Sequence, residues 1–240
     1  MKINVKGAII PNDDKWIYEM LEMDATSPKD IADSLPDTNE DIDVIINSGG
    51  GDVYSGSEIY TSLKTYPGKV NIKIVGVAAS AASVIAMAGD HIEISPTAQI
   101  MIHNAWTMAM GDINEMQKTV DMLDGVNRGI ANAYINKTGK TEDEILSLMN
   151  KETWFNAQDA VEHGFADSKM FDEAAPRLVA NSGQMLSDDV INRVTALVSK
   201  TPEMKIDIDA IANKVIEKMN NTNEKPKNTV NESGFNRFLF

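Results

Sequence analysis

Two serines stand in a segment that otherwise consists of small or apolar residues. Residues 76–90 read GVAASAASVIAMAGD, which places Ser80 and Ser83 among alanines. A hydroxyl buried without a hydrogen-bond partner costs about 1–3 kcal/mol, so each serine must either bond within the fold or perform chemistry. A serine nucleophile needs a general base, an acid that orients this base, and donors for the oxyanion. These requirements select candidates elsewhere in the chain.

The best candidate for the base is His103. The chain has three histidines, and His91 opens a strand-like run while His163 precedes a glycine that ends a helix. His103 instead ends the run QIMIH just before Asn-Ala-Trp. The end of a strand that opens into a loop is where a base can meet a cleft.

The segment NSGGGD, residues 47–52, follows the strand-like run IDVII directly. Three successive glycines allow backbone amides to approach a substrate closely, because no Cβ stands in the way. Such a turn can also hold a phosphate, but the flanking charge is Asp52 and no basic residue is near. The pattern therefore favours an oxyanion hole over a phosphate site.

The elements expected around these residues alternate between strands and helices. β-branched runs predict strands at 42–47, 70–77, 91–95 and 99–103. Helical spacing or small-residue content predicts helices over 54–66, 78–89, 113–134 and 157–164. Thr141 and Glu144 are spaced as a capping box at the start of one more helix. The pattern indicates an α/β fold with a helix-rich second half.

Composition excludes several classes of protein. The 240 residues contain no cysteine, which rules out disulfides, thiol nucleophiles and cysteine-based metal sites, and we expect no cofactor or metal. A net charge of −14 argues against binding nucleic acid or an anionic membrane. No run approaches the ~18 apolar residues that a membrane span needs, and no secretory segment is apparent at the start. We expect a cytoplasmic protein.

The segment NKTGKT, residues 136–141, ends like a phosphate-binding P-loop. The first glycine of that motif would fall on residue 134, which is Tyr134, and a helix rather than a strand precedes it. We interpret the segment as the end of a helix closed by Gly139. The sequence thus predicts no ATP site, and any ATP-driven unfolding would need a separate ATPase partner.

Charge and aromatic content divide the chain near residue 172. Residues 173–240 hold nine Lys/Arg and nine Asp/Glu, so the whole net charge lies in residues 1–172, as do all tryptophans and tyrosines. Apolar stripes predict helices within 173–219. Residues 220–240 have the composition of a flexible tail that ends in the Phe-rich GFNRFLF, which is either a docking peptide or an ordinary frayed terminus.

Four blocks in order, INSGGGDVYSG, GVAASAAS, MIHNA and WFNAQDAVEHGFAD, resemble the Clp protease proteolytic subunit family. They are most similar to the versions encoded in phage and prophage head-assembly clusters. The resemblance covers residues 1–172 and implies a serine peptidase domain on the ClpP/crotonase-like fold of stacked ββα units.

The resemblance also implies roles for individual residues. The family's nucleophile falls on Ser80 and its base on His103. Its oxyanion donors fall on the backbone amides of Gly51 and Ala81. Ser83, one helical turn after Ser80, is expected to be a structural hydroxyl bonded to the backbone.

The third catalytic position departs from the family pattern. Where the family usually has an aspartate two residues before an aromatic, this chain has Glu152; Asp167 is the second candidate. Gly49 replaces a common proline, and Asp52 stands where an apolar residue is common. The latter changes are expected to affect peptide binding beside the site and remove no catalytic group.

Together these observations predict an oligomeric serine endopeptidase that works through an acyl-enzyme. The resemblance implies a heptameric ring or stacked rings, and capsid or scaffold precursors as substrates during phage head maturation. Two alternatives remain: a non-catalytic head-assembly protein on the same fold, and a crotonase-type acyl-CoA enzyme. The second leaves the combination of Ser80, His103 and Glu152 without a purpose.

Overall fold

A computed structural model describes residues 1–172 of the chain. The expected helical extension, 173–219, and the expected flexible tail, 220–240, lie outside the described residues. Among the described residues, none of the helices is both long enough and apolar enough to cross a membrane.

The centre of the described part is an eight-stranded sheet with the order β2-β1-β3-β4-β5-β8, in which β6 pairs with β4 and with β7. Every pairing is parallel except β6 with β7, which is antiparallel. The strands are β1 (Lys2–Ile9), β2 (Ala25–Thr26), β3 (Ile42–Gly51), β4 (Val70–Ala79), β5 (His91–Ile94), β6 (Gln99–Ile102), β7 (Thr153–Asn156) and β8 (Ser168–Lys169). The expected α/β class is confirmed.

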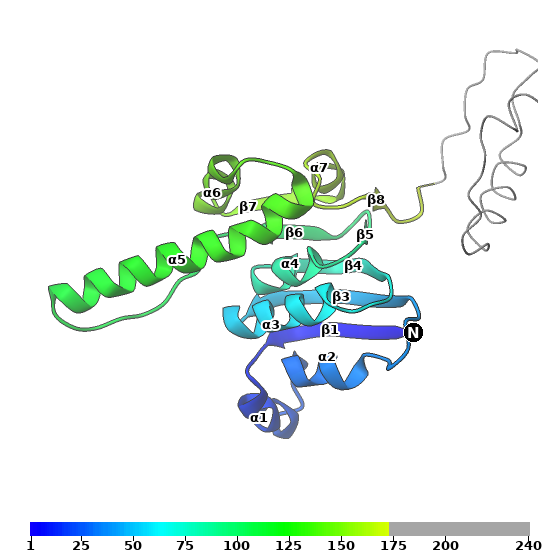
Figure 1. The fold of residues 1–240 in the computed structure, drawn as a ribbon, viewed down its shortest axis with the longest axis horizontal. Helices are drawn as coiled ribbons and strands as arrows, with labels where there is room; N and C mark the ends of the chain where they lie inside the picture. Colours follow the sequence, from blue (N-terminus) through cyan, green and yellow to red (C-terminus); the bar gives the residue numbers. More distant parts are fainter. Residues whose placement is uncertain (173–240) are drawn as a thin grey trace, which may run out of the picture. The chain divides into compact units, whose positions relative to one another are not determined.

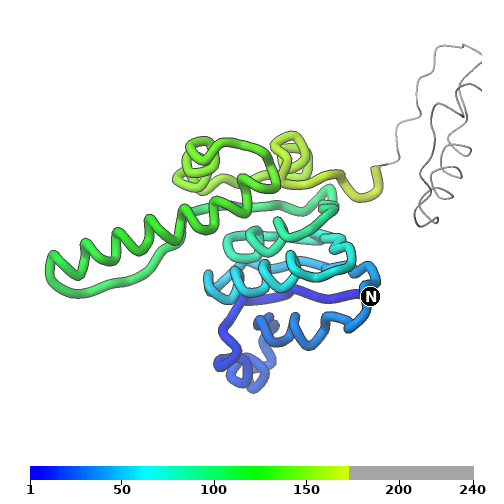
Figure 2. Tube along the Cα trace, viewed as in Figure 1, coloured from blue at the N-terminus to red at the C-terminus, as the bar shows by residue number. Residues whose placement is uncertain are grey.

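The helices connect these strands. They are the 3₁₀ turn η1 (Asn12–Asp14), α1 (Lys15–Met20), α2 (Pro28–Ser34), α3 (Val53–Lys64), α4 (Ala81–Ala86), α5 (Ile113–Thr138), α6 (Glu142–Asn150) and α7 (Ala157–Glu162). Figure 1 shows α3 and α4 lying across β3 and β4, while the first half of α5 projects away from the sheet. Figure 2 shows the segment between β6 and α5 running outward along that projecting half to the start of α5.

The helix ends follow local capping chemistry. The predicted capping box is present, because the Thr141 side chain accepts from the Glu144 amide and the Glu144 carboxylate accepts from the Thr141 amide. Gly139 closes α5 in a left-handed conformation with φ of 70°. The NKTGKT segment is therefore a helix end, as predicted.

The small-residue helix is shorter than expected. It spans only Ala81–Ala86, and all six of its residues are buried. Ala78 and Ala79 instead extend β4, where they pair with Ile100 and Met101 of β6. Small side chains suit this position because the helix packs closely against the sheet.

The glycine segment also differs from the expectation. It was predicted as a turn after a strand ending at residue 47, but β3 continues to Gly51. The continuation is stabilised by β1, whose Ala8 and Ile9 pair with Gly50 and Gly51 after a register shift. The strand pattern of residues 2–9 was missed, and without β1 the glycine segment has no partner that would extend β3.

Candidate active site

Ser80 occupies the turn between the end of β4 and the start of α4. Its backbone has φ of 54° and ψ of −126°, a conformation that L-residues rarely adopt. Its amide donates to the Met101 carbonyl at 3.0 Å, and its side chain makes no capping bond to α4. Strained backbone of this kind costs about 1–3 kcal/mol and is concentrated at functional sites. The turn leaves the Ser80 hydroxyl free for another partner.

That partner is His103. The parallel register pairs Ala79 of β4 with Met101 of β6, so the residues that follow these two strands emerge side by side. His103 Nε2 lies 2.8 Å from Ser80 Oγ, which is a hydrogen bond. The structure thus brings together two predicted residues that are 23 positions apart in the chain.

Two asparagines hold the segment that carries His103. The Ala105 amide donates to Asn127 Oδ1 on α5 at 2.8 Å. Asn104 Nδ2 donates to Asn150 Oδ1 at the end of α6 at 2.7 Å. Asn127 and Asn150 were not identified from the sequence, because they lie on helices far along the chain from His103. The bonds fix the backbone directly after the histidine.

Glu152 lies near His103 but does not bond to it. Antiparallel pairing of Ile102 with Thr153 places Glu152 beside His103, and the distance from Glu152 Oε2 to His103 Nδ1 is 4.0 Å. The Glu152 side chain is 59% exposed, compared with 20% for His103. At this separation the carboxylate attracts an imidazolium through charge, without a hydrogen bond.

Asp167, the second candidate for the third position, lies in a different group of side chains. Its Oδ2 accepts from the Ile92 amide at 2.7 Å and from Lys137 Nζ at 2.8 Å. His91 Nδ1 is 3.7 Å from the same oxygen. The structure therefore links Asp167 to β5 and α5, and it places Glu152 as the carboxylate beside His103.

The glycine segment passes directly beside Ser80. A Cβ atom added to Gly50 would lie 2.7 Å from Ser80 Cβ and 2.6 Å from the Ala79 carbonyl oxygen. Gly50 has φ of 94° and Gly51 has φ of 152°, both in the region that favours glycine. Sequence reasoning named Gly51 and missed Gly50, whose importance depends on how closely two strand ends approach each other.

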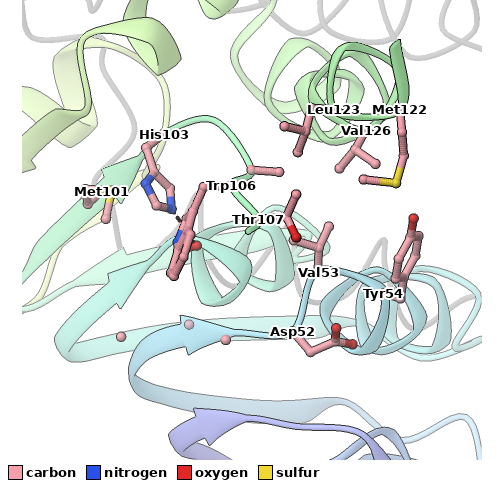
Figure 3. A pocket seen from close by; sticks show the side chains of 15 residues that line it. Asp52, Val53, Tyr54, Met101, His103, Trp106, Thr107, Met122, Leu123 and Val126 are labelled. Atoms are coloured by element: carbon pink, nitrogen blue, oxygen red, sulfur yellow. Dashed lines mark hydrogen bonds between the residues drawn. The ribbon is translucent and has the colours of Figure 1, made fainter. Parts of the chain in front are cut away.

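A cavity of about 570 Å³ opens in front of these residues (Figure 3). One wall is apolar and comes from Met122, Leu123 and Val126 of α5, which face the start of α3. Gly49, Gly50, Gly51, Ser80 and His103 line the end where the chemistry would occur. The remaining lining residues are Asp52, Val53, Tyr54, Met101, Ala105, Trp106 and Thr107. The volume and the concave shape are typical of a ligand site.

A buried hydrogen-bond chain supports the turn from behind. Ser83 Oγ donates to the Ser80 carbonyl at 2.6 Å, so Ser83 bonds to the backbone as predicted. Tyr134 Oη lies 2.8 Å from Ser83 Oγ and, because the Ser83 proton is already used, donates to it. Burial raises the pKa of the Tyr134 phenol, and its bond to Ser83 opposes that effect only in part. Tyr134 therefore remains protonated and connects α5 to the turn.

The residues of this site form no metal site. Among residues 1–172 there is no group of three or more His, Cys, Asp or Glu side chains placed to hold a metal ion. The groups that the structure brings together at the cavity are the Ser80 hydroxyl, the His103 imidazole and the glycine segment.

Comparisons with known proteins identify the family of the chain. The model of the Clp protease family matches residues 31–173. The ATP-dependent Clp protease proteolytic subunit 1 of Leifsonia xyli subsp. xyli is 28% identical over 133 residues, which are 55% of this chain and 68% of that protein. The corresponding subunit of Bacteroides fragilis is 30% identical over 133 residues, 55% of this chain and 64% of that protein.

The fold is also found among solved structures. A point mutant of ClpP1 from Listeria monocytogenes superposes with a TM-score of 0.58 at 20% identity, covering 70% of this chain and 90% of that chain. This likeness carries the fold alone. The match of the family model over more than half of the sequence shows that the chain belongs to the Clp protease family.

Proposed function

We propose that this chain is a serine-type endopeptidase with Ser80 as its nucleophile. The observation that carries the proposal is the 2.8 Å bond between Ser80 Oγ and His103 Nε2 at one end of the cavity. Acyl-transfer enzymes recurrently place a nucleophile within hydrogen-bond distance of a base, with a third group beside that base. Peptidase activity agrees with membership of the Clp protease family.

In this mechanism His103 accepts the Ser80 proton as Oγ attacks the peptide carbonyl. The imidazolium that forms is attracted by the Glu152 carboxylate at 4.0 Å. The amides of Gly51 and Ala81 donate to the oxyanion. His103 then gives the proton to the leaving amine, and an acyl-enzyme remains on Ser80. Water, deprotonated by the same histidine, hydrolyses this ester and restores the serine.

The crotonase-type alternative is less well supported. An enzyme of that kind would use the glycine-segment amides to hold a thioester oxyanion, but it would give the bond between Ser80 and His103 no task. A non-catalytic assembly protein would likewise have no use for the strained backbone at Ser80, whose φ is 54°.

We also propose that the protein assembles as a ring and processes phage capsid or scaffold precursors. Two observations support this: the resemblance of the four sequence blocks to head-assembly versions of the family, and a long C-terminal region, 174–240, beyond the residues that the family model matches. Self-cleavage within that region, or its use as a docking or scaffold segment, would fit the same role. A heptamer and a separate ATPase partner belong to this proposal.

The test is intact-mass analysis after reaction with a fluorophosphonate probe, in samples whose assembly state is measured by native mass spectrometry. The native chain is compared with Ser80→Ala and with Ser57→Ala, which removes an exposed hydroxyl on α3. We expect one adduct on the native chain and on Ser57→Ala, and none on Ser80→Ala. Truncation after about residue 172 in the native chain alone would demonstrate self-processing.

An assembled ring that does not react would refute the peptidase proposal and favour the assembly protein. An adduct that persists in Ser80→Ala would assign the nucleophile to another residue. Disappearance of processed capsid proteins from particles that carry Ser80→Ala would support the proposed substrates.

A further inference from the structure

Asp52 places one carboxylate at the substrate cavity. Of the fifteen residues that line the cavity, it is the only one with an acidic side chain, and none is a lysine or an arginine. Its Oδ1 is occupied, because it accepts from the Ser55 amide and from Ser55 Oγ, each at 2.7 Å. Within residues 1–172 its Oδ2 makes no hydrogen bond and the carboxylate forms no ion pair. One oxygen is therefore available to a ligand.

The surroundings of Asp52 suit a long side chain with a positive end. Figure 3 shows Asp52 below Val53 and Tyr54, across the cavity from the apolar residues of α5. Such a wall can contact the methylene stem of a lysine or arginine while the charged end reaches a carboxylate. The rings of Tyr54 and Trp106 line the same cavity, and aromatic faces attract cations.

We propose that Asp52 selects substrates with a lysine or arginine side chain next to the peptide bond that Ser80 attacks. The proposal rests on the proposed peptidase function, and it names the class of substrate. An acidic side chain at the same place would meet an unpaired carboxylate, and an apolar one would leave that carboxylate without a partner. A lysine ammonium or an arginine guanidinium can donate a charge-assisted hydrogen bond to the free Oδ2, while Oδ1 keeps its two bonds from Ser55.

The substitution that tests this is Asp52→Asn, because asparagine preserves the local fold. Asp52 is the N-cap of α3, and the carbonyl oxygen of asparagine caps as well as a carboxylate. Only the negative charge is removed. The matched control is Glu58→Gln, which removes one charge from an exposed position of the same helix that does not line the cavity.

The first measurement is kcat/KM for two acetylated peptides that differ only in arginine or norleucine at the position before the cleaved bond, and for a second pair varied after it. Acetylation removes the terminal ammonium, so the side chain is the only cation that is varied. We expect the native chain and Glu58→Gln to prefer arginine in one pair by about tenfold, or about 1.4 kcal/mol, and Asp52→Asn to lose that preference. If the native chain and Asp52→Asn showed the same ratio of kcat/KM for the arginine and norleucine peptides, the proposal would be overturned while the peptidase function remained intact.

The second measurement does not depend on catalysis. Binding of the same peptides to Ser80→Ala and to Ser80→Ala with Asp52→Asn is measured by calorimetry. We expect tighter binding of the arginine peptide to Ser80→Ala, by about tenfold, and equal binding of both peptides to the double variant. Equal binding to Ser80→Ala would refute the role of Asp52 even if the peptidase proposal had already failed for another reason.

Discussion

Replacing Gly50 with alanine should destabilise the protein, whereas the same change at the adjacent Gly49 should not. An added Cβ at Gly50 would lie 2.6 Å from the Ala79 carbonyl oxygen and 2.9 Å from the Ala81 amide nitrogen, and φ at this position is 94°. A Cβ at Gly49 would meet nothing within 4 Å, and its φ is outside the positive range. The pair differs by one position in β3, so Gly49→Ala is a matched control.

The magnitudes follow from these distances. A non-glycine residue at a rare backbone conformation costs about 1–3 kcal/mol, and inserting an atom into a packed site costs about 1–3 kcal/mol more. Alanine also lowers the conformational entropy of the unfolded chain, which raises the free energy of unfolding by about 0.4–1 kcal/mol. Gly50→Ala should therefore lower the free energy of unfolding by about 1–6 kcal/mol. Gly49→Ala should raise it by about 0.4–1 kcal/mol, because only the unfolded-state effect applies.

Thermal and urea unfolding of the two variants measure this difference. For a domain of this size about 1 kcal/mol shifts Tm by roughly 2–4 °C, so Gly50→Ala should melt well below Gly49→Ala. Moving the Ser80 turn should also slow fluorophosphonate labelling by at least about tenfold relative to Gly49→Ala, since misplacement of a reacting group by about 1 Å can cost about a hundredfold. A Gly50→Ala chain that melts and reacts like Gly49→Ala would refute the close approach of these two strand ends.

Two further changes test the groups around the turn. Tyr134→Phe removes a buried donor to Ser83 and should cost about 0.5–1.5 kcal/mol at pH 7. Burial raises the folded-state pKa of Tyr134 above the value of about 10 that the phenol has in the unfolded chain. Below about pH 10 the native chain therefore keeps the full contribution of Tyr134 to its free energy of unfolding. Above about pH 10 the unfolded chain loses the phenol proton first, so this free energy falls by up to about 1.4 kcal/mol per pH unit. Urea unfolding should therefore show the gap between native chain and Tyr134→Phe closing between about pH 10 and 11, and a constant gap would contradict the assignment. Glu152→Gln should lower kcat by no more than about fivefold, since an exposed charge pair is worth about 0.2–1 kcal/mol; a hundredfold loss would mean that the carboxylate bonds directly to His103 in the working enzyme.

The candidate nucleophile and base could be predicted because each carries a local signal. Ser80 is a polar residue in a segment of small apolar ones, and His103 follows an apolar run at the point where the chain enters a loop. The class of fold was also predictable, since β-branched runs alternate with helical spacing over most of residues 42–164. These patterns depend on residues close together in the chain.

What could not be predicted depends on pairing between distant strands. The strand at residues 2–9 carries a weak signal of its own, yet it extends β3 through the glycines and so fixes Gly50 against Ser80. Asp52 was expected to affect peptide binding, but its bond to the Ser55 amide depends on where α3 begins. The distance of 4.0 Å between Glu152 and His103 follows from the β6–β7 register, which no spacing in the sequence encodes.

The three candidate catalytic side chains differ in how many contacts within the chain hold them in place, and their positions in the sheet explain the difference. Ser80 follows β4, which pairs in parallel with β3 on one edge and with β6 on the other. Ser83 Oγ also donates a hydrogen bond to the Ser80 carbonyl. His103 follows β6, and hydrogen bonds to Asn150 and Asn127 hold the two residues that come directly after it in the chain. Glu152 precedes the four-residue β7, whose only strand partner in the described sheet is β6, and its side chain is largely exposed. The third position is therefore the one whose geometry a neighbouring subunit or a bound peptide would change most, because fewest contacts within the chain hold it in place.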